Sequence, residues 1–388
     1  MLRQIAAVTF LNFKSLSNRF WPSLVIVIGM ACVIGVLISM LSFNTGYVQS
    51  EMGAGDPGRG IVISDGRERE PSSSLTRDQA AAIMDGPGIR KDADGAPLAE
   101  GEILFDTPAI RRGTSVTDFL LIRGLGSKGL KLRPELKIVS GRMLRPGSRE
   151  LIVGKAAQDR FVGMAVGDKI ILPGGEWPIV GIFSTGGDIQ EGQFLADRDT
   201  LMAAVGRNAF NSVLVRLESA PNSLDALKAA LTGNPALSVI VERHSTYYEH
   251  LSGANALVFS TIAYTAAGIM AVGAMFGALK IMYGGVSART RQIGTLRALG
   301  FGALPVAISV VSECLLLALI GALIGSAIAW LLFNGAKTAY WGEFFDLKVS
   351  PGLIGLGILW AVAVAFLGGL LPAIHAARLP IVEALRAT

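Results

Sequence analysis

The chain has 388 residues, of which 51% are hydrophobic and 17% are charged, and its mean hydropathy is +0.50. Soluble domains carry about 25% charged residues, so this composition excludes an ordinary soluble protein and favours a membrane protein with one polar insert. The net charge of +5 does not indicate a nucleic-acid partner, because residues 44–252 hold 26 acidic and 24 basic residues. The remaining 11 basic and four acidic residues lie beside or within apolar segments.

Four apolar blocks are long enough to cross a bilayer, whose core takes about 20 helical residues. We predict transmembrane helices over residues 21–43, 251–283 (with a stalk), 301–333 and 351–375. The first block exceeds the apolar region of about 7–15 residues that a signal peptide carries, so we interpret it as a retained span. Cys32 and Cys314 lie inside these blocks, which leaves the polar insert without a disulfide.

Lysine and arginine in short flanks set the orientation of membrane spans. The flanking segments 1–20, 284–300 and 376–388 carry an excess of basic residues, whereas the short loop 334–350 has two lysines and two acids. We therefore predict that both termini and the segment 284–300 are cytoplasmic, and that loop 334–350 and residues 44–250 lie outside. The predicted fold is an α-helical membrane protein with four transmembrane helices plus a large α+β extracytoplasmic domain between helices one and two.

The polar insert, residues 44–250, has the pattern of a mixed α+β domain. Apolar runs predict strands at 60–64, 118–123 and 150–154, and a hairpin across 168–183 that turns at Pro173-Gly174-Gly175. Thr76 followed by Gln79 predicts a capping box, and Ser223 is expected to cap a second helix. The order "NSVLVRL", that helix and "LSVIVE" predicts a split βαβ unit of the ferredoxin-like kind, while 86–100 is expected to be a loop.

No residue pattern in the chain indicates catalysis. Nucleophile-elbow, zinc-protease and paired-cysteine motifs do not occur in the sequence. His244 and His250 are six apart, so on one helix they point in different directions and do not predict a shared metal. The stretch "GLGSKGLKL" lacks the spacing and the Lys-Ser/Thr pair of a phosphate-binding P-loop. We therefore predict no catalytic, metal or cofactor site on this chain.

A basic stretch, "SARTRQIGTLRALG" at 287–300, separates the second and third predicted spans. Ile293, Leu296 and Leu299 with Gly300 recur at three- to four-residue spacing, which predicts a short helix with an apolar stripe. The simplest interpretation is a cytoplasmic loop whose arginines follow the charge rule and touch anionic lipid.

The same stretch resembles the cytoplasmic coupling segment of ABC transporter permeases of the MacB/FtsX/LolC-type superfamily. The recurring form there is about Arg-Glu-Ile-Gly, two residues, then Arg-Ala-Leu-Gly. Here it is Arg291-Gln292-Ile293-Gly294 and Arg297-Ala298-Leu299-Gly300, with Gln292 in place of the glutamate and Ala288 where an acid often precedes. Two further regions resemble the family: residues 140–183, which are similar to its external domain, and the tail with Pro380, Glu383 and Leu385.

The resemblance implies a non-catalytic permease subunit of the bacterial inner membrane that drives export or extraction of an envelope substrate. Two copies of a separate cytoplasmic ATPase would bind ATP and magnesium, and a second identical or related permease would complete the complex. A periplasmic adaptor and an outer-membrane channel are further expected partners. The apolar stripe would enter a groove of the ATPase while the arginines fix its register. The coupling residues would be Arg289, Arg291, Gln292, Ile293, Gly294, Leu296, Arg297, Leu299 and Gly300.

Residues 245–283 contain no proline and as one helix would be about 58 Å long, well beyond the bilayer core of about 30 Å. Such a rod favours the transmission of motion, with Gly253 and Gly268 as its weak points. The resemblance describes the family in the same way, as mechanotransmission.

Polar and small residues within the spans have expected roles of their own. Glu313 is an acid inside the third apolar block, where an ionised group needs a partner. We interpret it as a structural hydrogen-bonding or hinge group rather than a proton carrier. Two pairs of glycines spaced by four, Gly273 with Gly277 and Gly321 with Gly325, predict close helix packing and candidate dimer contacts.

Two alternatives to a transporter remain open from the sequence. One is an FtsX-like transmembrane regulator, in which the same motion activates an external cell-wall hydrolase. The other is a membrane-anchored external enzyme or binding module, which the lack of catalytic motifs and the four spans disfavour. The external partner distinguishes the first alternative from a transporter.

Overall fold

The computed structural model describes residues 20–67, 69–113, 117–340 and 343–380, and the chain divides into two compact units. A helical unit comprises Met1–Thr45, Leu257–Ala336 and Leu347–Thr388, and an α+β unit comprises Gly46–Ala256 and Lys337–Asp346. Each unit has its own hydrophobic core.

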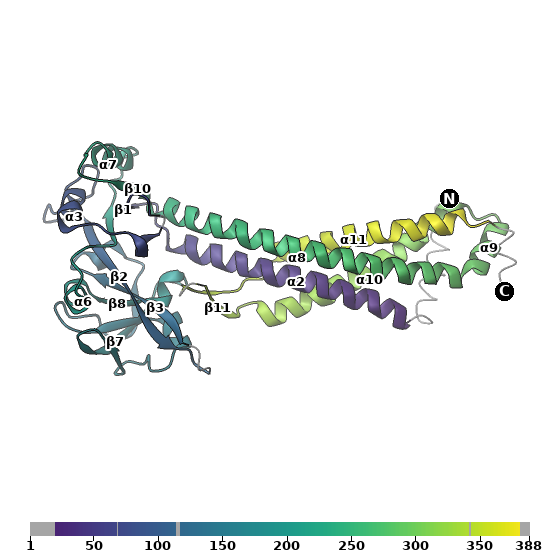
Figure 1. Ribbon diagram of the computed structural model, residues 1–388, viewed down its shortest axis with the longest axis horizontal. Helices are drawn as coiled ribbons and strands as arrows, with labels where there is room; N and C mark the ends of the chain where they lie inside the picture. The colour runs from purple at the N-terminus through teal and green to yellow at the C-terminus, as the bar shows by residue number, and fades with distance from the viewer. Residues whose placement is uncertain (1–19, 68, 114–116, 341–342, 381–388) are drawn as a thin grey trace. The chain divides into compact units, whose positions relative to one another are not determined.

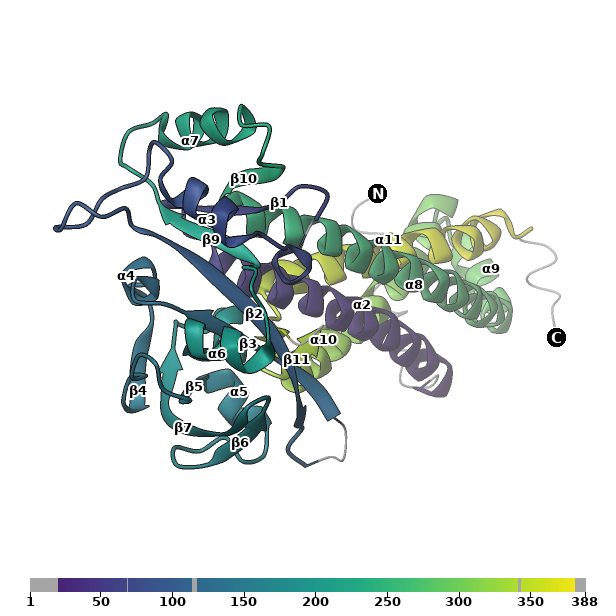
Figure 2. The ribbon, with the colours of Figure 1, turned by 60° about the vertical axis from the view of Figure 1, so that its left-hand side comes forward.

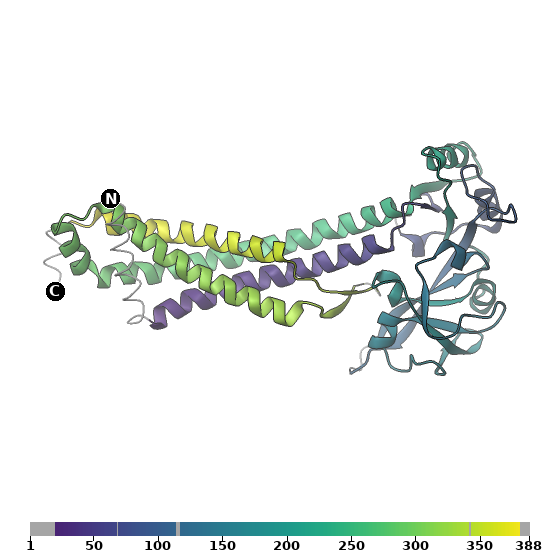
Figure 3. The same cartoon turned by 180° about the vertical axis from the view of Figure 1, so that it is seen from behind.

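Four long helices run side by side in the helical unit (Figures 1 and 3). They are α2 (Phe20–Ala54), α8 (His244–Ala288), α10 (Ala303–Phe333) and α11 (Pro351–Arg378). All four are long and apolar enough to cross a membrane. A short helix, α9 (Thr290–Ala298), lies between α8 and α10 at one end of the bundle (Figure 1). The predicted architecture of one span, a large α+β region and three further spans is confirmed.

Three of the long helices, α2, α8 and α11, extend beyond the predicted apolar spans, whereas α10 keeps within its span. The helix α2 continues through polar residues to Ala54, and α8 is one uninterrupted helix of 45 residues, about 68 Å long. Gly253 and Gly268 do not interrupt it. Residues 284–288, predicted to belong to the connecting segment, form its last turn. A helix satisfies the hydrogen-bonding needs of backbone N–H and C=O groups whether or not its side chains are apolar. Hydropathy alone therefore predicts helices that are shorter than the observed ones.

Two of the predicted packing glycines lie at a contact between helices of the same chain. A Cβ atom on Gly321 would lie 2.5 Å from the carbonyl oxygen of Val27, and one on Gly325 would lie 2.4 Å from that of Ala31. The assignment of this pair to a dimer interface is therefore wrong, because these glycines allow α10 to approach α2. A Cβ atom on Gly273 or Gly277 would meet no atom within 4 Å, and a dimer contact there stays a prediction.

The α+β unit is built on a ten-stranded mixed sheet, which Figure 2 shows from the side of the long strands β2 and β3. The strand order is β10-β1-β9-β2-β3-β8-β5-β7-β4, with β6 paired to β7. The strands are β1 (Arg59–Ser64), β2 (Ala99–Ile110), β3 (Thr117–Leu125), β4 (Lys137–Gly141), β5 (Leu151–Gly154), β6 (Lys169–Leu172), β7 (Gly175–Ser184), β8 (Phe194–Asp197), β9 (Ser212–Arg216) and β10 (Val239–Arg243). The helices are α3 (Arg77–Met84), α4 (Gly129–Leu132), α5 (Lys155–Arg160), α6 (Arg198–Val205) and α7 (Ser223–Thr232), with 3-10 turns η2 (Glu70–Ser72) and η3 (Ile189–Gly192).

Most local predictions for this unit hold, although the predicted loop 86–100 ends in the first two residues of β2. The predicted strands correspond to β1, β3, β5 and the β6–β7 hairpin, and Thr76 and Gln79 form the predicted capping box. The strands β9 and β10 both pair antiparallel with β1 between them, so β9, α7 and β10 form the split βαβ unit. Ser223 is not the cap of α7: it lies inside the helix, and its hydroxyl donates to the carbonyl of Glu218 instead.

The predicted short loop 334–350 contains a β-hairpin. The strands β11 (Lys337–Tyr340) and β12 (Glu343–Asp346) pair with each other, and both belong to the α+β unit. Phe344 of β12 is buried against Phe161, with the two rings 5.3 Å apart and edge to face. The four aromatic residues of this seventeen-residue loop did not by themselves predict this packing.

Candidate coupling site

The short helix α9 carries the residues that the sequence singled out. It begins directly after α8, with Arg289 as its N-cap residue, and Gly300 ends the segment in a left-handed conformation at φ +95° that favours glycine. Gly302 then caps the start of α10. Gly300 therefore allows the sharp turn between α9 and α10, whereas Gly302 has an extended backbone that any residue can adopt.

Arg289 holds the start of α9 to α10 through a two-fold ion pair with Glu313. Arg289 Nη1 donates to Glu313 Oε2 at 3.0 Å, and Nη2 donates to Oε1 at 2.8 Å. Both side chains are about nine-tenths buried. Two parallel charge-assisted bonds fix orientation as well as distance. This geometry supports the interpretation of Glu313 as a structural hydrogen-bonding group.

Two further contacts hold α9 to the rest of the helical unit. Ile293 is 7% exposed and belongs to the core cluster of this unit. Arg297 Nη1 donates to the carbonyl oxygen of Leu379, just past the end of α11, at 2.6 Å. The segment is therefore attached at its start, middle and end.

The predicted apolar docking stripe is wrong in one respect. Arg289 and Ile293 are four residues apart and share a helix face, and the ion pair turns that face toward the chain's own core. Leu296 is half-buried, whereas Leu299 is 73% exposed. The surface that remains accessible consists of Arg291, Gln292, Thr295, Ala298, Leu299 and Gly300. We call these residues the outer face of α9.

The other sequence-predicted positions lie elsewhere. Gly294 is buried within α9 beside Ile293. Pro380 follows α11 and is exposed, and Glu383 and Leu385 lie outside the described residues.

A buried ionic cluster in the α+β unit escaped the sequence analysis. Arg123 donates to Glu70 at 2.7 Å and to Glu102 at 2.6 Å, and Arg133 makes two bonds with Glu102. Burial would raise the pKa of Glu102, but Arg133 and Arg123 outweigh it and lower this pKa to about 2. The cluster joins residues from β2, β3, η2 and the segment after α4. It is a structural element of this unit, and charged residues scattered along the sequence gave no signal for it.

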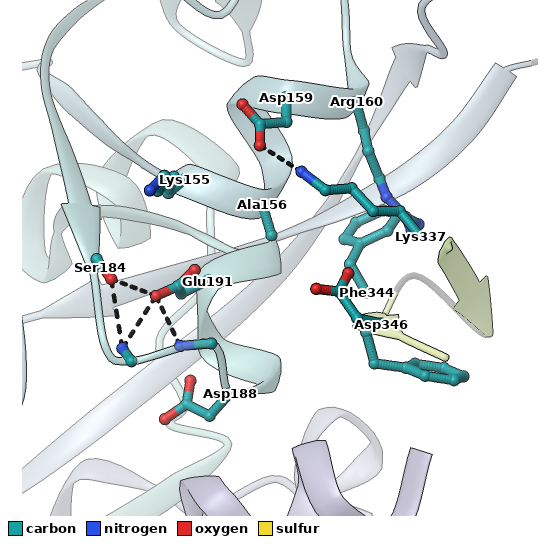
Figure 4. Close-up of a pocket in the computed structure, with 13 residues that line it drawn as sticks. Lys155, Ala156, Asp159, Arg160, Ser184, Asp188, Glu191, Lys337, Phe344 and Asp346 are labelled. Carbon is teal, nitrogen blue, oxygen red and sulfur yellow. Dashed lines mark hydrogen bonds and ion pairs between the residues drawn. The ribbon is translucent and has the colours of Figure 1, made fainter. Parts of the chain in front are cut away.

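A cavity of about 320 Å³ opens in the α+β unit between α5, the loop 184–191 and the β11–β12 hairpin (Figure 4). Lys337 pairs with Asp159 at 2.5 Å, and the guanidinium of Arg160 lies over the ring of Phe344. Glu191 accepts from the hydroxyl of Ser184 and from three backbone N–H groups of residues 185–187.

Three of the four carboxylates that line this cavity serve as structural acceptors. Burial raises the pKa of Asp188 to about 6, and this side chain accepts from Thr185 Oγ1 and from the backbone N–H of Gln190. Asp188, Glu191 and Asp159 are thus each engaged by neighbouring groups. We assign the cavity no catalytic role.

Comparison with known proteins places both units in one family. The MacB-like periplasmic core domain matches residues 23–234, and the FtsX-like permease C-terminal domain matches residues 264–381. The chain belongs to the MacB/FtsX-type ABC transporter permeases. It is a multi-pass membrane protein with a large extracellular domain, to which the α+β unit corresponds.

Individual relatives show the same relationship. The ABC transporter permease YknZ of Bacillus subtilis (strain 168) is 28% identical over 65% of this chain and 66% of its own. The permease YvrN of the same organism is 24% identical over 97% of this chain and 98% of its own. The macrolide export ATP-binding/permease protein MacB of Shewanella sp. (strain W3-18-1) is 30% identical over 47% of this chain but only 28% of its own length. This permease thus spans about two thirds of YknZ and less than a third of that MacB protein.

Proposed function

We propose that this permease transmits the motion of a separate cytoplasmic ABC ATPase to its extracellular domain and thereby drives export or extraction of a substrate. The observation that carries the proposal is the attachment of α9: an ion pair, a buried isoleucine and a carbonyl contact hold one side, and the other side is free. A segment that receives force must be fixed to what it moves and accessible to what moves it.

The continuous helix α8 supports the same proposal. It starts at His244 within the α+β unit and ends at Ala288, one residue before the arginine that pairs with Glu313. A displacement of α9 is therefore passed directly to a helix that continues into the extracellular domain. ATP and magnesium would bind to the ATPase, and this chain would be non-catalytic.

The proposed assembly contains two permease chains, identical or related, and two ATPase subunits in a bacterial inner membrane. Both termini and α9 face the cytoplasm in this arrangement, because basic residues flank these positions. A periplasmic adaptor and an outer-membrane channel are further members of the proposed assembly.

The outer face of α9 provides the test. We would purify the full-length chain with its ATPase and compare the variant Arg291→Glu/Leu299→Ser with the wild type. Both side chains are exposed, so membrane insertion and thermal stability should not change. We expect ATPase association to weaken roughly ten-fold or more, as the loss of interface anchors typically does.

Arg378→Glu is the matched control, since Arg378 is an exposed arginine at the end of α11 and not on α9. It should leave ATPase association intact. Unchanged association and unchanged ATP-driven transport in the α9 variant would refute the proposal.

A further inference from the structure

An open cavity of about 420 Å³ lies in the helical unit, where the first turn of α2 shares walls with the last turns of α8 and with α10. Its lining is largely apolar and includes Ile26, Ile281 and Leu317, with Pro22 and Ser23 at the start of α2. Among the described residues, Lys280 is the lysine that lines it. The cavity thus combines an apolar wall with a single flexible cation.

Lys280 has no anionic partner within the described ranges 20–67, 69–113, 117–340 and 343–380. Its side chain is exposed and enters no hydrogen bond or ion pair there. A lysine inside an apolar helix needs an anion or a path to the membrane interface. Phe20 and Trp21, which are 61% and 76% exposed, precede the α2 residues that share the cavity with Lys280. Exposed aromatic residues at a span end are typical of the interface, where lipid phosphates lie.

The described residues and the N-terminal segment do not supply the missing negative charge. Residues 1–19 contain no acid and three basic residues, so their sequence offers no carboxylate to Lys280. Glu313 also lines the cavity, but both of its oxygens accept from Arg289.

We propose that this cavity binds one anionic phospholipid, with its phosphate on the ammonium of Lys280 and an acyl chain against Ile26, Ile281 and Leu317. The wall that the lipid contacts includes Glu313, which anchors α9. The binding itself does not depend on the proposed coupling to an ATPase.

The test uses the full-length chain in mixed micelles of phosphatidylglycerol and phosphatidylcholine, with native mass spectrometry of the lipid retained longest. The wild type should retain one phosphatidylglycerol per chain. Lys280→Met keeps the apolar stem but removes the charge, and it should lower the preference for phosphatidylglycerol about five-fold, since one lysine contributes roughly that factor. Lys348→Met is the matched control, an exposed lysine that does not line the cavity, and it should retain the wild-type preference.

A second variant tests the cavity rather than the charge. A Cβ atom on Gly284 would meet no atom within 4 Å, so Gly284→Leu can fill the space without displacing a helix. It should remove the retained lipid while Lys280 is still present. Equal retention by the wild type and both variants would overturn the proposal. Displacement by inorganic phosphate would overturn the lipid assignment in favour of a free anion. Loss of a dimer in Gly284→Leu with no loss of lipid would assign the cavity to a second copy of the chain.

Discussion

The two units of this permease bury charge in different ways. Among the described residues of the helical unit, Arg289 and Glu313 form a pair in which each charge has the other as its one ionic partner. In the extracellular domain, Glu102 bonds two arginines, and one of these also bonds Glu70. Removal of one member of the pair leaves the other buried charge without a counter-charge. Removal of one member of the cluster leaves part of the opposite charge in place. We infer that the pair attaches α9 to α10 at one point, whereas the cluster stabilises several elements of the extracellular domain together.

The largest effect should follow from breaking the pair. Glu313→Gln leaves the Arg289 guanidinium buried without a counter-charge, which typically costs about 3–5 kcal/mol. The free energy lost should appear as a lower thermal midpoint of the full-length chain in detergent. It should also appear as faster tryptic cleavage after Arg291, because the start of α9 is released.

The double variant Arg289→Met/Glu313→Met sharpens this prediction. Replacement of both charges by apolar side chains of similar length is often close to neutral. Its thermal midpoint should therefore recover most of the loss. A single variant as stable as the wild type would show that water or lipid reaches the pair, and the contrast between the two units would fail.

Local elements could be predicted from the sequence, whereas the partners of the buried charges in the two units could not. The spans, the strand pattern and the split βαβ unit follow from local periodicity, which sequence reports directly. Glu313 was expected to need a partner because an acid stands out in an apolar block, but three arginines in the nearby segment gave no means to choose Arg289. The cluster around Glu102 joins residues that are far apart in the chain and ordinary in type. Only the register of β2 against β3 brings Glu102 and Arg123 close together.

A smaller, pH-dependent effect is expected at the edge of the cluster. The pKa of Glu100 is raised from 4.5 to about 7, first by burial and second by the neighbouring carboxylate of Glu102. Arg198 Nη1 is 3.5 Å from Glu100 Oε1, and Oε2 is buried without a hydrogen-bond partner among the described residues. The other charged groups that face this carboxylate include Arg133, and the backbone N–H of Lys128 donates to it weakly.

The sign of the effect follows from this raised pKa. Between pH 4.5 and 7 the unfolded chain releases the Glu100 proton more readily than the folded chain, so this group lowers stability as pH rises. The change from 4.5 to about 7 corresponds to at most about 3 kcal/mol. Glu100→Gln should therefore stabilise the chain at pH 8 and have little effect at pH 4.5. Thermal unfolding of both proteins across this range is the measurement, and a difference that does not vary with pH would contradict it.

The smallest effect should come from Lys337→Ala on the β11–β12 hairpin. Lys337 and Asp159 are 46% and 41% exposed, and such surface pairs contribute about 0–1 kcal/mol. Phe344→Ala on the same hairpin removes a fully buried ring and should cost about 3–5 kcal/mol if the site cannot collapse. Urea or thermal unfolding of the two variants separates charge from packing as the force that holds the hairpin to the extracellular domain. If Lys337→Ala proved as costly as Phe344→Ala, an exposed ion pair would stabilise the protein as much as a buried side chain. Burial would then not explain why the two units differ in how their charges contribute.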